Sequence, residues 1–202
     1  MFHLDTERLT IRPWQPADRP SFAAFTQDTE VMRYVHRGEP YTETEIDEFL
    51  ARQQRQLETR DMCMGAMVEK SSGRIVGVAG VQPLGGSGDL EIGWWLGRDV
   101  WGRGYATEAG RAAMNHVLHT LQRPRVVAVI DPGNDPSIAV VTRLGFRYDR
   151  RYTGAELNAS SRMATARCFI LRSFLSFPGG PAEPCAGRRP AGAKCRTLRR
   201  AP

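Results

Sequence analysis

A glycine-rich turn between a strand pattern and a helix pattern is the feature that most constrains the fold of this chain. The segment "WGRGYATEAG", residues 101–110, follows the apolar run "DLEIGWWLG" and leads directly into a helical pattern. Glycine permits backbone conformations that other residues avoid, and a helix that begins at such a turn presents free amides to phosphate groups. The turn predicts either a phosphate site or a purely structural strand-to-helix connection.

Three kinds of phosphate turn are compared with this segment. A P-loop needs GK followed by Ser or Thr, and the chain has no such sequence. A dinucleotide fingerprint needs a third glycine at position 107, where Thr107 stands, and Asp131 lies further on than the ~20 residues expected for the ribose-binding acid. The turn of a coenzyme A site is the remaining candidate, with the amides of residues 102–106 facing the pyrophosphate.

The rest of the chain predicts alternating strands and helices in one α/β domain with a central mixed sheet. Alternation and turn signals predict strands over 7–14, 62–70, 75–84, 89–97, 125–131, 146–152 and 164–172. Helical patterns cover 16–28, 42–59, the segment after the glycine turn to about 124, and 135–146. In the last helix we expect Asp135 as N-cap, Pro136 in the first position and Gly145 as the stop.

The positive charge of the chain is concentrated in its last thirty residues. Of 28 Lys and Arg and 22 Asp and Glu, residues 173–202 hold 6 basic residues and one acidic residue, which leaves 22 and 21 in residues 1–172. The last segment is rich in Pro, Gly, Ala and Arg, so we expect a disordered tail behind a domain that spans residues 1–172. Weak binding of nucleic acid through the tail is the most that this charge predicts.

Cysteine and histidine spacing predicts no metal site. The four cysteines (Cys63, Cys168, Cys185, Cys195) form no CxxC pair, and His116 and His119 have no evident third ligand. The N-terminal segment has no apolar signal core, and no run of about 18 apolar residues is present. We therefore expect a cytoplasmic protein with free thiols.

The segments "TERLTIRPW", "EIGWWLGRDVWGRGYATEA", "DPGNDPSIAVVTRLGFRYDR" and "CFIL" together resemble the GNAT family of N-acetyltransferases, closest to its RimJ/RimL-type branch. The resemblance covers about residues 5–171. It implies a mixed, mostly antiparallel sheet of about six to seven strands, flanked by helices and splayed at an acetyl-CoA site. It also implies acetyl transfer from acetyl-CoA to a primary amine, and a homodimer is a possible assembly.

The resemblance assigns the cofactor residues position by position. The pyrophosphate motif Q/R-x-x-G-x-G/A corresponds to Trp101, Gly102, Arg103, Gly104, Tyr105 and Ala106, with Trp101 in place of Gln or Arg. Main-chain groups around Trp95 and Leu96 are expected to contact the pantetheine and the thioester oxygen. Asn134 matches the family asparagine that contacts the cofactor.

Candidate catalytic groups follow from what acetyl transfer requires. The amine must lose a proton and the thiolate must gain one. Glu91, within an apolar strand, is the candidate base, with a structural acid paired to an arginine as the alternative. Glu108 is a weaker choice. The usual tyrosine acid is absent, because Val141 occupies its position, so Ser137 is the candidate donor to the thiolate, with Tyr148 and Tyr152 as substitutes.

The acceptor is not fixed by the sequence. Glu39, Glu43 and Glu45 would attract a cationic amine, or would form the charged first turn of a helix. Trp14, Tyr34 and Trp95 would line a groove, or would pack in the core. A protein N-terminus, a polyamine and an aminoglycoside stay open as acceptors. A CoA-binding sensor without transferase activity and an RNA-associated protein are the alternatives from other functional classes.

Overall fold

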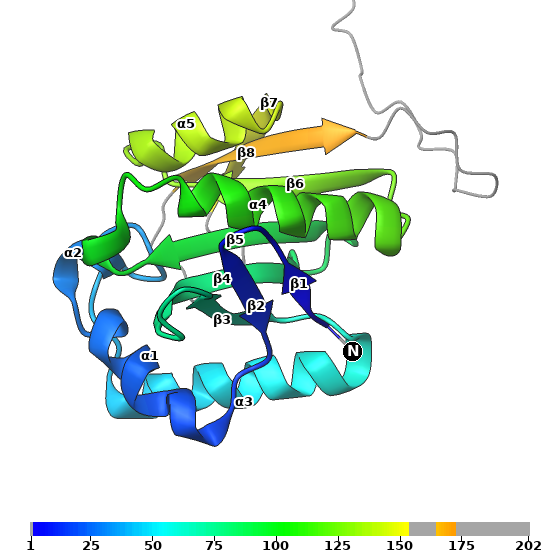
Figure 1. The fold of residues 1–202 in the computed structure, drawn as a ribbon. Coiled ribbons are helices and arrows are strands. Elements are labelled where there is room, and N and C mark those ends of the chain that lie inside the picture. Colours follow the sequence, from blue (N-terminus) through cyan, green and yellow to red (C-terminus); the bar gives the residue numbers. More distant parts are fainter. Residues whose placement is uncertain (1, 154–164, 173–202) are drawn as a thin grey trace, which may run out of the picture.

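The computed structural model describes residues 2–153 and 165–172, whose strands form one sheet with helices on both faces (Figure 1). The order of strands is β1-β2-β3-β4-β5-β6-β8-β7, and each neighbouring pair is antiparallel except β5 and β6, which are parallel. The strands are β1 (Leu4–Asp5), β2 (Leu9–Arg12), β3 (Met64–Glu69), β4 (Ile75–Pro83), β5 (Leu90–Leu96), β6 (Arg125–Ile130), β7 (Arg147–Thr153) and β8 (Thr165–Arg172).

The mixed, mostly antiparallel sheet is confirmed, and it has one strand more than the sequence patterns indicate. The additional strand, β1, is only two residues long and pairs with β2. A strand of this length is too short to show an alternation of apolar and polar residues.

Helices α1 (Arg19–Thr26) and α3 (Glu43–Arg60) cover one face of the sheet, while α4 (Tyr105–Asn115) and α5 (Asp135–Arg143) cover the other (Figure 1). Short helical segments are η1 (Pro16–Asp18), α2 (Thr29–Met32), η2 (Arg98–Val100) and the π-helical turn η3 (His116–Thr120). In the part of the chain that the structure describes, no helix is both long enough and apolar enough to cross a membrane.

Helix boundaries follow local sequence signals. Thr42 and Glu45 form a reciprocal capping box at the start of α3. At the end of α5, Gly145 has a φ of 88°, and the amides of Gly145 and Phe146 bond back to Thr142 and Val141. This is a Schellman motif, so Gly145 ends the helix as predicted.

The predicted N-cap of α5 was wrong by one residue. Asn134 is the N-cap, and its Oδ1 accepts a hydrogen bond from the Ser137 amide over 3.2 Å. Asp135 lies in the first turn instead, where its charge still complements the helix dipole. Both residue types are good caps, which is why the sequence did not decide between them.

Each face of the sheet carries its own buried cluster. One cluster joins α4 and α5 to the sheet, and the other consists mainly of residues from α1, α3 and the sheet, including Phe22, Phe49 and Met64. Helix α4 lies directly on β5, because a Cβ at Gly110 would approach the Trp94 ring to 3.1 Å and Leu144 to 2.9 Å. This close contact places the middle of α4 against Trp94 of β5.

Candidate active site

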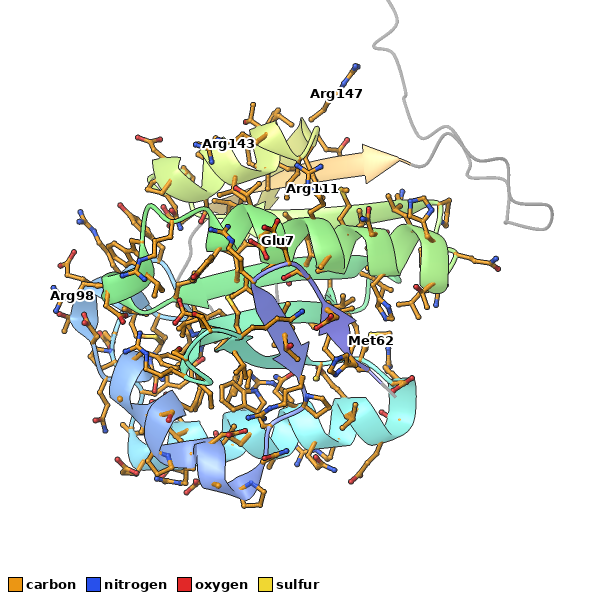
Figure 2. The ribbon with its side chains drawn as sticks, viewed as in Figure 1. Glu7, Met62, Arg98, Arg111, Arg143 and Arg147 are labelled. Atoms are coloured by element: carbon orange, nitrogen blue, oxygen red, sulfur yellow. The ribbon has the colours of Figure 1, made fainter. Side chains whose placement is uncertain are left out.

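The site begins where β5 and β6 separate. Their only paired residues in the described chain are Glu91 and Val127, whereas β5 pairs with β4 along its whole length. Beyond this point β5 has no strand partner on its β6 side among the residues that the structure describes. The separation opens into a cleft of about 1460 Å³ lined by residues of β5, β6, the glycine-rich turn, α4 and α5. Figure 2 shows Arg111 on α4 and Arg143 on α5, which both line this cleft.

The register of β5 decides which main-chain groups face the gap. The amide of Gly97 donates to Val76 of β4 over 3.0 Å, so Gly97 and, two residues earlier, Trp95 direct their main-chain groups toward β4. Trp94 and Leu96 consequently direct theirs toward the gap. Of the two residues expected at the pantetheine, Leu96 therefore presents main-chain groups to the gap, and Trp94 does so in place of Trp95.

The glycine-rich turn forms the entrance to α4. Gly102 and Gly104 have φ values of 75° and 82°, and Gly104 is the N-cap of the helix without any side-chain cap. The first amides of α4 are therefore left for another acceptor, and a Cβ at Gly102 would meet no atom within 4 Å. Gly102, Gly104, Tyr105 and Ala106 all line the cleft. This open, uncapped turn fits a diphosphate.

Trp101, which replaces Gln or Arg of the expected motif, has its own local function. Its indole N–H donates to the carbonyl oxygen of Leu96 over 2.8 Å, although the side chain is 51 % exposed. The indole thus ties the glycine-rich turn to the end of β5. The sequence offered no signal for this contact.

Glu91 lies at the point where the gap closes. It is half-buried, lines the cleft, and accepts a hydrogen bond from Gln82 Nε2 over 3.0 Å. Burial raises the pKa of the Glu91 carboxyl to about 7, although the hydrogen bond from Gln82 and the amide of Val129 favour the ionised form. Among the described residues no arginine pairs with Glu91.

Alternation along β5 places the Glu91 side chain on the face that α1 and α3 cover. Ile92 and Trp94 pack into the cluster beneath α4, whereas Trp95 packs into the cluster around Phe49. Glu91 shares its face with Trp95. The carboxylate is therefore reached from the side opposite α4, while the glycine-rich turn lies at the start of α4.

The candidate thiolate donors differ in position. Ser137 is half-buried in the first turn of α5 and lines the cleft, as does Asn134. Val141 is fully buried. Tyr148 is 55 % exposed, stacks edge-on against Phe169 and does not line the cleft, and the side chain of Tyr152 lies outside the described residues.

The acidic residues that would attract an amine have structural partners instead. Glu43 pairs with Arg19 over 2.8 Å, and Glu45 pairs with Arg37 and caps Thr42. Glu39, also an ion-pair partner of Arg37, is no part of the cleft lining either. Glu108 is engaged as well, by Arg8 and Thr6. The first-turn explanation of Glu43 and Glu45 therefore holds.

Two of the three aromatic candidates line the cleft. Trp14 packs edge-on against Phe22, while Tyr34 and Trp95 contribute to the lining. A Cβ on Gly133, in the loop after β6, would lie 3.6 Å from the Tyr34 ring, so this ring lies beside the far wall of the gap.

The cysteine and histidine predictions are tested only in part. Cys63 is a buried free thiol, and burial raises its pKa to about 12. His116 contacts the Phe2 ring edge-on, and the described residues contain no group of three His, Cys, Asp or Glu side chains that could hold a metal. Cys185, Cys195 and the predicted tail over 173–202 lie outside the described residues.

A mixed sheet with two separated strands beside an uncapped glycine-rich turn is the fold of an acyltransferase that uses a coenzyme A thioester. Residues 8–147 match the family model described as an acetyltransferase (GNAT) domain, and the chain belongs to this family. It is an acetyl-CoA-dependent N-acetyltransferase.

Known proteins agree with this assignment. The chain is 28% identical over 146 residues to the uncharacterized N-acetyltransferase p20 of Bacillus licheniformis, covering 71% of this chain and 82% of that protein. An acetyltransferase crystal structure from Agrobacterium tumefaciens aligns with a TM-score of 0.71 and 27% identity over 86% of this chain and 95% of its own. RimL, a ribosomal L7/L12 alpha-N-protein acetyltransferase solved with coenzyme A, shares the fold at a TM-score of 0.70 and 16% identity, over 85% of this chain and 98% of RimL.

Proposed function

We propose that the protein transfers the acetyl group directly from acetyl-CoA to an α-amine in a ternary complex, with Glu91 as the base. The observation that carries this proposal is the position of Glu91 at the closed end of the gap. The strand from Glu91 to Leu96 extends about 17 Å at ~3.3 Å per residue. It can therefore run alongside an extended thioester arm whose diphosphate lies at Gly102–Ala106.

In this arrangement the donor lies in the gap, with its diphosphate on the free amides of the glycine-rich turn and its arm along Trp94 and Leu96. The acceptor enters from the face of Trp95 and Tyr34. Glu91 takes one proton from the ammonium group, and the free amine attacks the thioester carbonyl. As the C–N bond forms and the C–S bond breaks, the second proton lost by the nitrogen goes to the thiolate. Ser137 is the group proposed to donate a hydrogen bond to the departing thiolate, and Asn134 adds a contact to the donor.

The basicity of Glu91 favours an α-amine as acceptor over an alkylamine. An α-ammonium group has a pKa of about 7.7–8.0, whereas an alkylammonium such as that of lysine has a pKa of about 10.4. A carboxyl group whose pKa burial raises to about 7 is nearly matched to the former. RimL, named for acetylation of an α-amine on a protein, shares this fold, which supports the same choice by analogy.

The test is release of free CoA with matched acceptors. We expect turnover with a peptide that has a free N-terminus and no lysine, and little with the same peptide carrying a blocked N-terminus and a lysine, or with spermidine. An enzyme that prefers spermidine or an aminoglycoside would contradict the α-amine. A protein that binds acetyl-CoA and releases no thiol with any amine would be a CoA-binding sensor.

Glu91→Gln tests the base. We expect kcat to fall by roughly 10²–10⁴-fold while the Kd for acetyl-CoA stays within about twofold. Because the base must be ionised, wild-type kcat/KM should rise with pH through about 7, and this acid limb should be absent in the variant. Glu30→Gln, which neutralises an exposed carboxylate in the same lining, is the matched control and should keep both the rate and the limb.

A further inference from the structure

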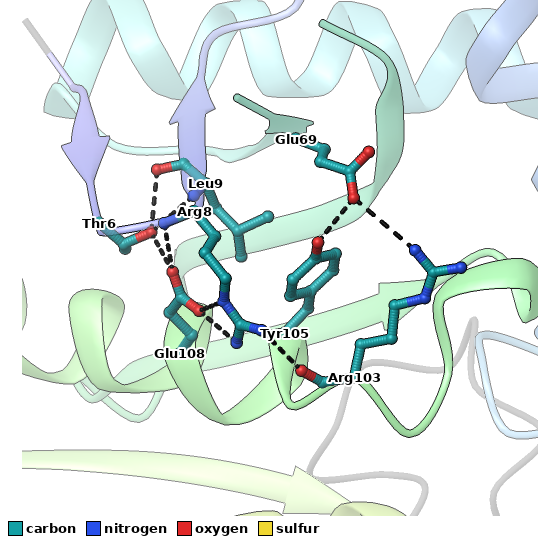
Figure 3. Close-up of polar contacts among 7 residues, drawn as sticks. All are labelled: Thr6, Arg8, Leu9, Glu69, Arg103, Tyr105 and Glu108. Carbon is teal, nitrogen blue, oxygen red and sulfur yellow. Dashed lines mark hydrogen bonds and ion pairs between the residues drawn. The ribbon is translucent and has the colours of Figure 1, made fainter. Parts of the chain in front are cut away.

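Beside the glycine-rich turn lies a group of charged and polar side chains from three distant parts of the sequence (Figure 3). Thr6 and Arg8 come from the turn between β1 and β2, Glu69 ends β3, and Tyr105 and Glu108 lie in the first turns of α4. None of them is used in the proposed chemistry. They form a connected network, and one member, Arg8, contacts the main chain of the turn.

The central contact is a hydrogen bond from Arg8 Nη1 to the carbonyl oxygen of Arg103, over 3.0 Å. In a trans peptide the carbonyl of one residue and the amide of the next point in opposite directions. Holding the Arg103 carbonyl toward Arg8 therefore directs the Gly104 amide away from Arg8. Because Gly104 has no Cβ and a φ of 82°, little else fixes the plane of this peptide.

Arg8 is itself held on three sides. Its Nε and Nη2 contact Glu108 Oε2 over 2.7 and 2.6 Å, and its guanidinium lies 4.6 Å from the centroid of the Tyr105 ring. All three guanidinium nitrogens thus have a partner within the protein. Because the adjacent Glu108 carboxylate compensates its charge, Arg8 acts on the turn through the direction of its hydrogen bond to the Arg103 carbonyl.

The partners of Arg8 are anchored in turn. The other oxygen of Glu108 accepts from Thr6 Oγ1 over 2.6 Å and from the Arg8 amide over 2.8 Å. The Tyr105 hydroxyl donates to Glu69 over 2.6 Å, and Glu69 also accepts from Ser72. Arg8, Glu108 and Tyr105, which together we call the clamp, are therefore connected to the sheet through Thr6 and Glu69.

We propose that Arg8 is a positioning residue that locks the peptide between Arg103 and Gly104, so that the turn presents an amide rather than a carbonyl oxygen to the diphosphate of the donor. This inference rests on the proposed function, in which the diphosphate lies on this turn. Without the clamp, the peptide can rotate and turn an oxygen toward the phosphates. The clamp thereby selects donors that carry a diphosphate over the bare acyl-pantetheine arm.

The experiment compares two donors, acetyl-CoA and S-acetylpantetheine, the second of which lacks the diphosphate and the nucleotide. For Arg8→Met we expect kcat/KM with acetyl-CoA to fall roughly tenfold, through KM, which is the loss of about one charge-assisted hydrogen bond. The value with S-acetylpantetheine should not change. Arg8→Lys should behave like Arg8→Met, because an ammonium group does not reproduce the fork to Glu108 and the carbonyl.

Glu108→Gln separates positioning from direct contact with the phosphates. If Arg8 acts through the peptide, loss of its carboxylate partner weakens calorimetric binding of CoA. If Arg8 binds phosphate directly, the freed guanidinium makes the binding of CoA tighter, and the proposal is overturned. Arg19→Met, which removes a paired surface arginine beside α3, is the matched control and should leave both donors unaffected.

Equal losses with both donors in Arg8→Met would also overturn the proposal, since they would indicate a general structural effect. Failure of the proposed function looks different, because wild-type protein would then release no CoA. The calorimetric Kd values for CoA still test the clamp in that case.

Discussion

The protonation of Glu91 links the site to the stability of the fold. Because burial raises the pKa of Glu91 from 4.5 to about 7, its contribution to stability is complete below about pH 4.5 and is lost as the pH rises through 7. Glu91→Gln removes the free-energy cost of burying an ionised carboxylate at high pH. We expect the variant to be more stable than wild type at pH 8, by up to about 2–3 kcal/mol, and equally stable at pH 4.5 and below.

Urea unfolding at the two pH values is the measurement. Glu108→Gln is a control of opposite sign. Burial would raise the pKa of Glu108, but hydrogen bonds from Thr6 and Arg8 keep it below its usual value. That variant should be less stable than wild type at pH 8, with a difference that shrinks as the pH falls. A Glu91→Gln variant without a gain at pH 8 would show that the carboxylate is well solvated.

Gly104→Asp tests the glycine-rich turn. The substitution introduces a strained left-handed residue and a negative charge at the N-cap of α4, so micromolar binding of acetyl-CoA in calorimetry should be lost. Gly73→Asp is matched in strain, because Gly73 has a φ of 68° and no neighbour within 4 Å of its Cβ, yet it lies outside the cleft lining. It should bind as wild type does. If Gly104→Asp and Gly73→Asp bound acetyl-CoA equally well, Gly102 and Gly104 would form a structural turn that does not bind the donor.

At the scale of elements, Asn134 both caps the start of α5 and lines the cleft. Asn134→Ala removes the cap and should cost about 1 kcal/mol, or roughly 2–4 °C in Tm, while Asn134→Ser keeps a capping oxygen and should stay near wild type. If the asparagine amide also contacts the donor, both variants bind acetyl-CoA more weakly. Scanning calorimetry and titration of the two variants separate these effects, and unchanged binding by Asn134→Ser would remove Asn134 from the donor site.

The elements were predictable where the signal is local. Caps, glycine stops and alternation identify α3, α5 and the longer strands, and the glycine-rich turn with its helix is visible in ten residues. Helix α2, four residues long, carries no periodic pattern. The contact of Arg8 with Glu108 joins residues 100 positions apart, and each has a sufficient local explanation on its own. Such pairs become visible only when the sheet order is known.

At the scale of the whole molecule, the separation of β5 from β6 was expected only through the family resemblance. The apolar patterns of both strands are equally compatible with full pairing, because buried parallel strands have the same composition. Only the described structure shows that pairing stops at Glu91 and Val127. The same limit applies to the acceptor, since the ion pairs of Glu43 and Glu45 depend on neighbours that the sequence does not place.

The domain boundary at residue 172 can be tested by truncation. We propose that residues 1–172 are a complete catalytic domain, since β8, the last strand along the part of the chain that the structure describes, ends at Arg172. The protein without residues 173–202 should keep its kcat/KM for acetyl-CoA and a small peptide within about twofold, because a tail of net charge +5 is screened beyond about 8 Å at physiological salt. A large loss of rate would place the tail at the site.

The opening between β5 and β6 also bears on self-association. Unpaired strand edges at the rim of a sheet invite a strand from a second molecule, and proteins usually keep such edges short or covered. Here long unpaired edges lie in the middle of the sheet, with α4 and α5 over one face and α1 and α3 over the other. An extended, flexible arm can lie along these edges, whereas a whole strand of a neighbouring molecule would meet helices on both faces. The proposed acceptor needs to insert only its terminal amine. In the proposed binding mode, these edges are available to the arm of the donor but are closed to pairing along their length with a strand of a second molecule.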